Sequence, residues 1–321
     1  MKIPRFAYAA IILLAAFGFA RPAWGWGCEG HQVIALIAEK QMTPKARAMA
    51  DKILDASPIS PELKRFCPEG GLNAFVNSST WADDERPVQP NTGAWHYIDI
   101  PLGVSHGNLR NYCPASTGCV LTALQAQLAV LRDPRATAQG KADALRFVIH
   151  FVGDLHQPLH TETNDDLGGN CVPVKFLGHA PVETNVKWAT YRPNLHAIWD
   201  FGIIQAQWPG LTSAQVAERL ERKYKSRIVV WASQPVNVAA WIWQSHRLAE
   251  TVAYGDLPVH IALQTPEPVT SCNGDDHISN RMLQLHETLG AAYLKAVEPT
   301  VEMQLARAGA RLAAVLNSLW P

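Results

Sequence analysis

The sequence predicts an all-α fold: a mainly helical single domain with long loops and at most one short β-strand segment. Apolar residues recur at helical spacing in several windows, most clearly over 120–132 and 139–155. Only Val172–Phe176 has the composition of a strand. No repeat, low-complexity tract or linker divides the 321 residues, and 48% hydrophobic against 17% charged residues is typical of a well-packed globular protein.

Residues 1–25 have the composition of a secretory signal peptide. Basic residues precede the apolar run 9–20, which is too short to span a bilayer comfortably, so we expect no membrane anchor. Small residues three and one positions before Trp26 predict cleavage in front of that residue, with cleavage after Ala20 as the alternative. We therefore expect an exported protein, periplasmic or extracellular, with one domain over residues 26–321.

The charge count excludes a strongly basic surface of the kind that binds nucleic acid. The chain has 28 basic and 28 acidic residues, and residues 1–25 hold three of the basic ones and no acid. The mature chain would carry 25 basic against 28 acidic side chains, a net charge of about −3 with histidine neutral. An anionic substrate would have to be attracted locally, for example by bound metal cations.

The amino-terminal third is predicted to contain two helices and then irregular structure. Residues 30–39 carry apolar side chains at helical spacing, and a threonine–proline pair starts a second helix over 43–55. Prolines and glycines over 58–77 predict loops with short turns, and 81–87 is predicted to be an acidic loop or helix end.

The rest of the chain is predicted to alternate helices with one long loop. The helices over 120–132 and 139–155 are followed by a loop over 163–178 that contains the short β-prone segment. Four further helices are predicted over 185–201, 213–231, 236–254 and 279–319. Pro299 would cap or kink the last of these.

Six cysteines fit an exported protein with up to three disulfides. Six cysteines allow fifteen pairings, so the sequence does not fix them. Cys113 and Cys119 bracket a short loop and are the easiest local pair to join. No Cys-x-x-Cys spacing occurs, which favours disulfides over thiolate zinc ligands. The six are Cys28, Cys67, Cys113, Cys119, Cys171 and Cys272.

Two copies of a His-x-x-x-Asp pattern indicate metal binding. His150 and Asp154 stand four residues apart on a predicted helix, so both side chains can converge on one point, and His196 and Asp200 repeat this spacing. A proline break then lets His160 turn toward a second point. Neutral imidazole and carboxylate are ligands that zinc accepts. Core histidines beside a capping aspartate are the alternative, but two such pairs favour a multinuclear metal site.

The remaining histidines and the tryptophan-rich region are assigned to packing or surface positions. The candidate ligands are His31, Asp83, His96, His150, Asp154, His160, His196 and Asp200. The histidines that fit no ligand spacing are His106, His156, His179, His246, His260, His277 and His286. Trp231, Trp241 and Trp243 are more simply explained as helix core than as a platform for nucleobases.

Five motifs occur in order between Trp26 and Asp200. They are Trp26-Gly27-Cys28-Glu29-Gly30-His31, Trp81-Ala82-Asp83, His96-Tyr97-Ile98-Asp99, the segment from His150 through Asp154 and Gln157-Pro158-Leu159 to His160, and Asn194-Leu195-His196 followed by Trp199-Asp200. This series resembles the mung bean nuclease family of secreted, trinuclear-zinc, single-strand-preferring type I nucleases. The resemblance implies the fold shared by trinuclear-zinc nucleases and zinc-dependent phospholipase C.

The resemblance also implies three Zn²⁺ ions per chain and a ligand set for each. One ion would be bound by Asp83, His96, His150 and Asp154. A second would be bound by the α-amino nitrogen and carbonyl oxygen of Trp26, by His31 and by Asp154 as a bridge. The third would be bound by His160, His196 and Asp200. Because an internal peptide nitrogen cannot act as an amine ligand, cleavage before Trp26 would be an activation step.

The activity implied is zinc-dependent endonuclease hydrolysis of phosphodiester bonds in single-stranded DNA and RNA, giving 5′-phosphate products, by a monomer. Two zinc ions would share a water of lowered pKa, and the third would stabilise the departing 3′ oxygen. Whether the protein also acts as a 3′-nucleotidase is left open. The resemblance assigns catalysis to Asp83, Arg86 and Asp154, although several relatives have lysine where Arg86 stands. It assigns substrate contacts to Arg86, Tyr97, Asp99 and Asn170.

Two alternative functions remain open at this point, and Tyr97 and Asn170 also have simpler structural explanations. A zinc-dependent phospholipase C shares the fold and the three-zinc plan, but its third site uses a glutamate where this chain has Asp200. Tyr97 could equally be a packing residue, and the glycine-rich loop before Asn170 could be an ordinary turn. The second alternative is a secreted metal-binding protein without enzymatic activity.

Overall fold

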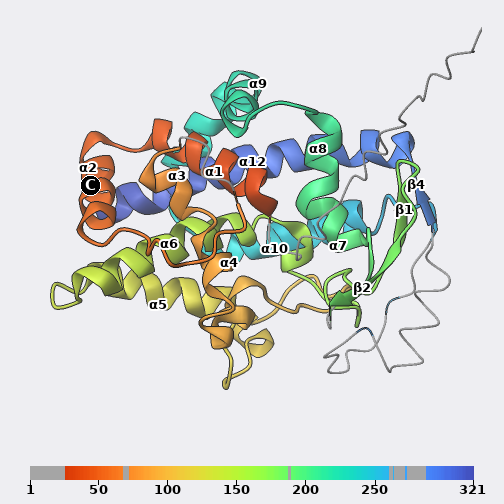
Figure 1. The fold of residues 1–321 in the computed structure, drawn as a ribbon, viewed down its shortest axis with the longest axis horizontal. Coiled ribbons are helices and arrows are strands. Elements are labelled where there is room, and N and C mark those ends of the chain that lie inside the picture. The colour runs from red at the N-terminus through yellow and green to blue at the C-terminus, as the bar shows by residue number, and fades with distance from the viewer. Residues whose placement is uncertain (1–25, 68–71, 187–188, 260–262, 264–271, 273–286) are drawn as a thin grey trace, which may run out of the picture.

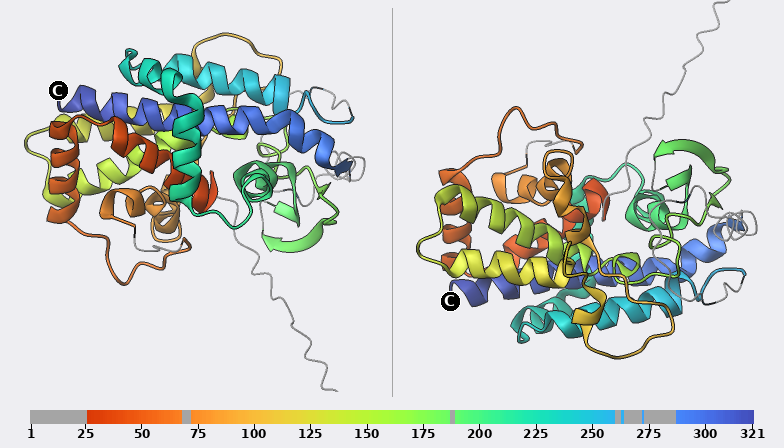
Figure 2. Two further views of the ribbon diagram at one scale, coloured as in Figure 1. Left: turned by 90° about the horizontal axis from the view of Figure 1, so that it is seen from above. Right: turned by 90° about the horizontal axis from the view of Figure 1, so that it is seen from below.

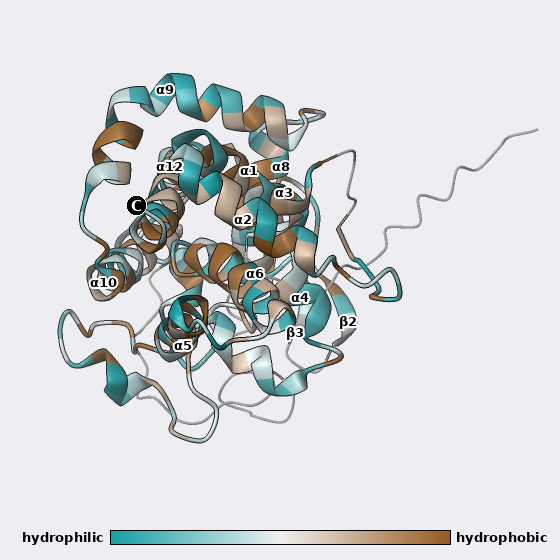
Figure 3. Ribbon diagram, turned by 90° about the vertical axis from the view of Figure 1, so that its left-hand side faces the viewer, coloured by the Kyte–Doolittle hydropathy of each residue, from teal (hydrophilic) through white to brown (hydrophobic). Residues whose placement is uncertain are grey.

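The long carboxy-terminal helix α12 (Ala291–Leu319) lies at the centre of the molecule, with α1 (Gly27–Gln41), α6 (Ala138–Asp154) and α9 (Ser213–Ser233) packed against it (Figure 1). The computed structural model describes residues 26–67, 72–186, 189–259, 263, 272 and 287–321. Figure 3 shows hydrophobic residues where α6 and α12 lie, and predominantly hydrophilic residues along α9. The predicted helical single domain is confirmed.

Small residues let α1 approach α12 closely. A Cβ atom at Gly309 of α12 would lie 2.6 Å from the Cβ of Ile37 of α1, so only glycine fits at this crossing. Alanines at 306, 308, 310 and 313 are fully buried on the same helix. Pro299 lies inside α12 without ending it. This close contact fixes α1, which carries His31, on the helical core.

The helices predicted over 43–55, 120–132 and 139–155 are confirmed as α2 (Pro44–Ala56), α5 (Val120–Arg132) and α6. Thr43 caps α2 by accepting from the backbone N–H of Ala46 at 3.1 Å, and Thr137 caps α6 in the same way. The later helices are α9, α10 (Val238–Leu248) and the π-helix η5 (Ala249–Ala253). Short elements in the first half are α3 (Ala74–Ser78), α4 (Trp81–Glu85), η1 (Pro90–His96), η2 (Leu109–Tyr112) and η3 (Pro158–His160).

The helix predicted over 185–201 is wrong. The chain instead forms the antiparallel pair β2 (Val182–Val186) and β3 (Ala189–Arg192), followed by α7 (Leu195–Ala197), the π-helix η4 (Ile198–Gly202) and α8 (Ile203–Gln207). The Arg192-Pro193 bond interrupts any helix here, because the residue before proline disfavours the α region. Asn194 then starts the new helical turn by accepting from the N–H of Ala197 at 2.8 Å.

Two other boundaries also differ from prediction. Residues 74–78 form α3 inside the predicted loop, because Asn73 caps the turn by accepting from the N–H of Val76 at 3.0 Å. The last helix starts at Ala291, after β4 (Glu287–Leu289) pairs in parallel with β1 (Val174–Phe176). The predicted strand segment is therefore confirmed, whereas residues 279–286 and the predicted signal peptide over 1–25 lie outside the described residues.

Three disulfides connect the six cysteines. The predicted local pair Cys113–Cys119 is confirmed, and the other two are Cys28–Cys67 and Cys171–Cys272. Cys28–Cys67 lies at the start of α1, and Cys171–Cys272 anchors the 163–178 loop. Across the part of the chain that is described, no helix is both long and apolar enough to cross a membrane.

Candidate metal centre

Six separate elements bring the predicted ligands together in the interior. They are α1, α4, η1, α6, η3 and the α7–η4 turn. All eight side chains are buried: His31, Asp83, His96, His150, Asp154, His160, His196 and Asp200. Their donor atoms form three groups able to hold a metal ion, each with atoms within 4.8 Å of one another. Burial of so many ionisable groups is costly unless they are paired or bind metal.

The first group has the dimensions of a tetrahedral metal site. His96 Nδ1, His150 Nε2 and Asp154 Oδ2 are 3.0–3.1 Å apart. Asp83 Oδ1 lies 3.6 Å from the His96 atom and 3.7 Å from the His150 atom. Bonds of about 2.0–2.2 Å in tetrahedral geometry place ligand atoms about 3.3–3.6 Å apart. The four residues therefore surround a point suited to one ion.

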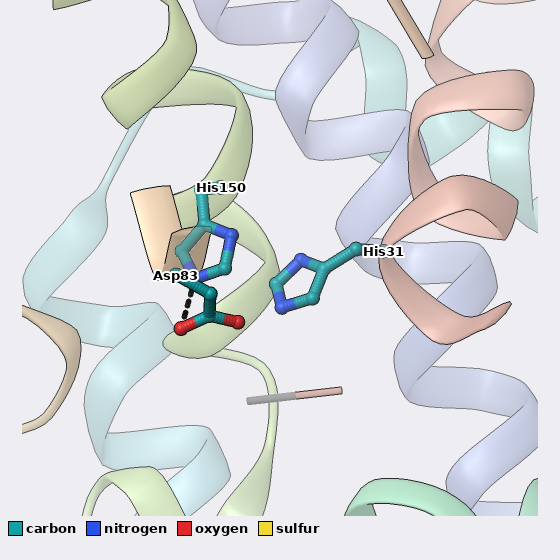
Figure 4. Close-up of side chains that lie close together, drawn as sticks. All are labelled: His31, Asp83 and His150. Carbon is teal, nitrogen blue, oxygen red and sulfur yellow. Dashed lines mark ion pairs between the residues drawn. The ribbon is translucent and has the colours of Figure 1, made fainter. Parts of the chain in front are cut away.

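The second oxygen of Asp154 faces a different partner. His31 Nε2 lies 3.4 Å from Asp154 Oδ1, whereas Asp154 Oδ2 belongs to the first group. The His31 ring stacks on that of His150 with 4.0 Å between centroids, and Figure 4 shows both imidazoles beside Asp83. The carboxylate of Asp154 can thus bridge two adjacent ions.

Trp26 stands at the amino end of α1, next to the second group, which consists of His31, Asp83 and His150. Its side chain is fully buried, and its carbonyl oxygen accepts from the N–H of His31 at 3.2 Å. A carbonyl oxygen has two lone pairs, so this hydrogen bond leaves one available for a cation. Gly27 follows at φ +30°, where an added Cβ would meet the Phe201 ring at 2.3 Å. The glycine is therefore needed for α1 to begin at this place.

The third group lies at η3 and the α7–η4 turn. His196 Nε2 is 3.3 Å from Asp200 Oδ2, and His160 Nε2 is 3.9 Å from Asp200 Oδ1. The two imidazole rings are stacked with centroids 5.0 Å apart. The His-x-x-x-Asp spacing places both side chains on one side even though the turn is partly a π-helix.

Backbone carbonyls orient three of the imidazoles. The Nδ1 atoms of His150, His160 and His196 lie 2.7, 2.9 and 2.6 Å from the carbonyl oxygens of Ser79, His96 and Gly168. Each Nδ1 therefore donates its proton to a carbonyl oxygen, which leaves Nε2 as the ring nitrogen available to a metal ion. Gln157 similarly donates to Asp200 Oδ1 at 2.8 Å. Such partners are typical of metal ligands.

Several buried atoms have no hydrogen-bond partner among the described residues, as expected of metal ligands. Among the candidate ligands they are both ring nitrogens of His31, Nε2 of His96 and of His160, Oδ1 of Asp83 and of Asp154, and Oδ2 of Asp200. A buried polar atom left unpaired costs roughly 1–3 kcal/mol. A bound cation would satisfy those atoms that face other candidate ligands, such as Asp83 Oδ1 and Asp154 Oδ1, so the residues present fit a metal centre.

The protonation states of the histidines also suit metal binding. Burial lowers the pKa of His31 to about 4, and that of His96 and of His196 to about 3. These imidazoles are therefore neutral near pH 7, as metal coordination requires. His150 differs, because its burial is outweighed by Asp154 and Asp83, which raise its pKa to about 9. Metal binding at the first group would displace that proton.

The predicted substrate residues lie around the centre in different settings. Arg86 Nη1 is 3.8 Å from Asp83 Oδ1, so the guanidinium borders the first group. Tyr97 and Asp99 are exposed and line a cavity of about 40 Å³ together with Tyr112. Asn170 donates from Nδ2 to the Leu167 carbonyl at 2.9 Å, which stabilises its own loop.

Sequence reasoning missed the network that positions His196. The Gly168 carbonyl belongs to a loop whose Asp166 accepts from the N–H of Gly169 at 3.1 Å and from the Tyr254 hydroxyl at 2.6 Å. Tyr254 also lies 3.2 Å from Glu162 Oε1. The Asp-x-Gly-Gly sequence, with left-handed backbone at both glycines, was the available signal.

Histidines and tryptophans outside the ligand set mostly match their predicted roles. His156 and His246 are buried and bonded to backbone carbonyls, whereas His106 and His179 are exposed. Trp241 is core, while Trp231 and Trp243 are only partly buried. His260, His277 and His286 lie outside the described residues.

Comparison with known proteins decides the family. The model of the S1/P1 nuclease family matches residues 26–321. The chain belongs to the S1/P1 nuclease family. The resemblance inferred from the motifs is thereby confirmed, and the protein is a hydrolase of that family with three buried His/Asp groups placed to hold metal ions. Nucleic acid is the class of substrate that this family implies.

Its relatives include plant and fungal nucleases. The chain is 28% identical over 306 residues to Endonuclease 2 of Arabidopsis thaliana, covering 92% of this chain and 91% of the relative. It is 28% identical over 315 residues to Nuclease P1 of Penicillium citrinum, covering 92% and 97%. Similarity to Nuclease S1 of Aspergillus oryzae is 29% over 194 residues, covering 59% and 58%.

Proposed function

We propose that this protein is a zinc-dependent endonuclease that hydrolyses phosphodiester bonds of single-stranded DNA and RNA to 5′-phosphate products. The observation that carries the proposal is a pair of adjacent donor groups that share His150, with a third group nearby, while Asp154 directs one oxygen at His31 and the other at His96. Two cations close together can bind both non-bridging and leaving oxygens of a phosphodiester. The all-nitrogen and oxygen donor set, without thiolates, suits zinc in a hydrolytic site.

The proposed ligand sets follow the three groups. The first ion would be held by Asp83, His96, His150 and Asp154. The third would be held by His160, His196 and Asp200. The second would use His31, Asp154 and the amino terminus at Trp26, which requires export and cleavage before that residue. The buried position of Trp26 beside His31 supports this assignment.

The side chains around the centre would bind and orient the substrate. When bound, zinc ions supply Lewis-acid charge that lowers the pKa of water and attracts phosphate. Arg86, bordering Asp83, would donate hydrogen bonds to the phosphate of the scissile bond. Tyr97 and Asp99 would hold a nucleobase at the adjoining cavity, by stacking and by accepting from a base edge. Asn170 would contact a neighbouring phosphate with its remaining N–H.

Metal analysis and paired activity assays test this function. We expect about three zinc ions per mature chain by elemental analysis, and loss of cleavage of single-stranded oligonucleotides on chelation, with recovery on adding zinc. Phosphatidylcholine micelles are the control substrate. Turnover of phospholipid without cleavage of nucleic acid would favour the phospholipase alternative. Fewer than two ions per chain would favour a non-enzymatic protein.

The amino-terminal ligand has its own test. A mature protein extended by one glycine ahead of Trp26 should lose most of its activity and about one metal ion per chain, because the amine moves away from the site. A mature protein lengthened by one glycine after Pro321 serves as the matched control. Full activity and full metal content in the amino-terminally extended protein would refute the terminal-amine ligand.

A further inference from the structure

A second, basic cavity lies between α9 and α12, away from the metal centre. It measures about 380 Å³ and is lined by Ser226, Arg227, Val230, Trp231 and Arg307. Figure 2 shows α9 crossing the long helix α12. The Ser213 hydroxyl, at the start of α9, donates to Gln32 beside His31. Arg227 is 14 residues further along, past a kink of α9 at Tyr224, and the residues that line the cavity include no candidate metal ligand.

The two guanidinium groups of this cavity meet at one sulfur atom. Arg227 Nη1 lies 4.0 Å from Met303 Sδ, and Arg307 Nη2 lies 3.2 Å from the same atom. A thioether is only a weak acceptor, so these contacts use little of the donor capacity of either arginine. One oxyanion with several acceptor oxygens is therefore large enough to reach both groups.

Arg307 has donors that the protein does not satisfy. Its Nη1 donates to the Gln304 amide oxygen at 2.9 Å, but its buried Nε has no hydrogen-bond partner among the described residues. Within the same residues, no carboxylate oxygen lies within 4.0 Å of Arg307 or Arg227. A half-buried guanidinium without an acidic partner leaves donors and charge available for a ligand.

The neighbouring acidic groups already have other partners. Glu302 accepts from Lys223 and from the Tyr224 hydroxyl, and Glu218 faces Arg222 at 4.0 Å. Burial lowers the pKa of Arg307, and the positive charge of Arg227 lowers it further. Two like charges held together in this way repel each other, and a bound anion would remove that repulsion.

The cavity wall holds one of its two arginines in place. The Arg307 guanidinium lies over the Trp231 ring, 5.1 Å from the ring centroid, and Trp231 is only partly buried. Stacking on an aromatic face fixes the plane of the guanidinium, which lowers the entropy lost when a ligand binds. The Ser226 hydroxyl is a further donor in the lining. The site is thus built for an anion with several oxygens.

We propose that the cavity between Arg227, Arg307 and Trp231 binds a phosphate group. The ligand is either a phosphate group of a single strand whose other end occupies the metal centre, or free inorganic phosphate. Binding of a strand rests on the proposed function, whereas binding of inorganic phosphate does not. The chain as a whole is not basic, so this local arginine pair would supply a phosphate contact that the overall charge of the protein does not provide.

Steady-state kinetics of the metal-loaded mature protein test whether the cavity binds a strand of the substrate. Arg227→Gln should raise KM for a 20-nucleotide single strand about 3- to 10-fold at unchanged kcat, and lower the salt-dependence slope by about one. A dinucleotide that occupies only the metal centre should be cleaved normally. Arg222→Gln is the matched control, since it removes an exposed arginine of the same helix outside the cavity.

Equilibrium dialysis with radiolabelled inorganic phosphate tests whether the cavity binds free phosphate. The wild-type protein should bind one more phosphate per chain than Arg227→Gln, whether or not it cleaves nucleic acid. A lower phosphate count at unchanged KM would assign the cavity to free phosphate. If Arg227→Gln matches the wild type in both assays, or if Arg222→Gln reproduces its effects, the phosphate site is refuted.

Discussion

Replacing Gly153 by alanine should disturb the metal centre without removing any ligand. Gly153 is buried in the last turn of α6, next to Asp154. An added Cβ would lie 2.8 Å from His31 Nδ1 and 2.9 Å from His31 Cε1, where ordinary contacts are 3.4 Å or longer. The His31 ring would have to move by several tenths of an ångström.

The expected loss of metal affinity depends on the direction in which the His31 imidazole can move. His150, Gly153 and Asp154 all belong to α6, so relief of the contact moves His31 away from the Asp154 oxygen that lies 3.4 Å from its Nε2. Metal–ligand distances tolerate changes of only about 0.2 Å. Disturbing a ligand through its surroundings typically weakens metal binding about 10- to 100-fold, which equals about 1.4–2.7 kcal/mol.

Helix propensity alone predicts that Gly153→Ala stabilises the protein. Alanine in a helix interior is favoured over glycine by about 1 kcal/mol, so any loss must come from the contact with His31. Gly140→Ala, near the start of the same helix, is the matched control and should leave metal binding unchanged. In a His31→Ala background, Gly153→Ala should have no further effect on metal affinity, because the obstructing ring is gone.

Competition titration with a chromophoric zinc chelator gives the affinities of the four variants. The expected result is a weakened site in Gly153→Ala alone and no added loss in the double variant. Equal affinity and equal activity for Gly153→Ala and wild type would refute the argument. An equal loss in both backgrounds would show that the alanine acts elsewhere than on His31.

Two further predictions concern the network behind His196. Tyr254→Phe removes the hydroxyl that holds Asp166 and should weaken one metal site about 10- to 100-fold, whereas Tyr224→Phe, which also loses a buried hydrogen bond, should lower only the melting temperature. Equal metal affinity in both variants would contradict this. Burial, and then Asp166, raise the pKa of Glu162 well above its ordinary value. Wild-type stability from this group therefore falls as pH rises above about 4.5, so Glu162→Gln should gain in melting temperature relative to wild type between pH 5 and 8. A pH-independent difference would count against a protonated Glu162.

The local part of the site could be predicted from the sequence because it depends on helical spacing. His150 and Asp154 need only one turn of α6 to converge, and the apolar periodicity around them specifies that helix. The same reasoning placed His196 and Asp200 together even though the predicted helix around them was wrong. A single turn after Asn194 was sufficient, and the strands before Pro193 did not affect it.

Over residues 182–202, β-strand propensity and cap chemistry outweigh the helical pattern. Thr184 and Tyr191 are residue types that favour strands, and Pro193 ends any preceding helix, yet a run containing a histidine–aspartate pair suggested one continuous helix. The sequence contained these signals. The β4–β1 pairing was different, because parallel strands more than 100 residues apart leave no local pattern.

By itself, the sequence determined the helical class, the family motifs and the pairs of ligands that share one helical turn, because these depend on short-range periodicity. Only the tertiary structure decided that Asp154 turns one oxygen to His31 and the other to His96, and that carbonyls of Ser79 and Gly168 orient the imidazoles. It also decided that Arg227 and Arg307 share one cavity. These contacts join segments far apart in the chain, and their distances are set by packing of α1, α6, α9 and α12, which residue spacing does not specify.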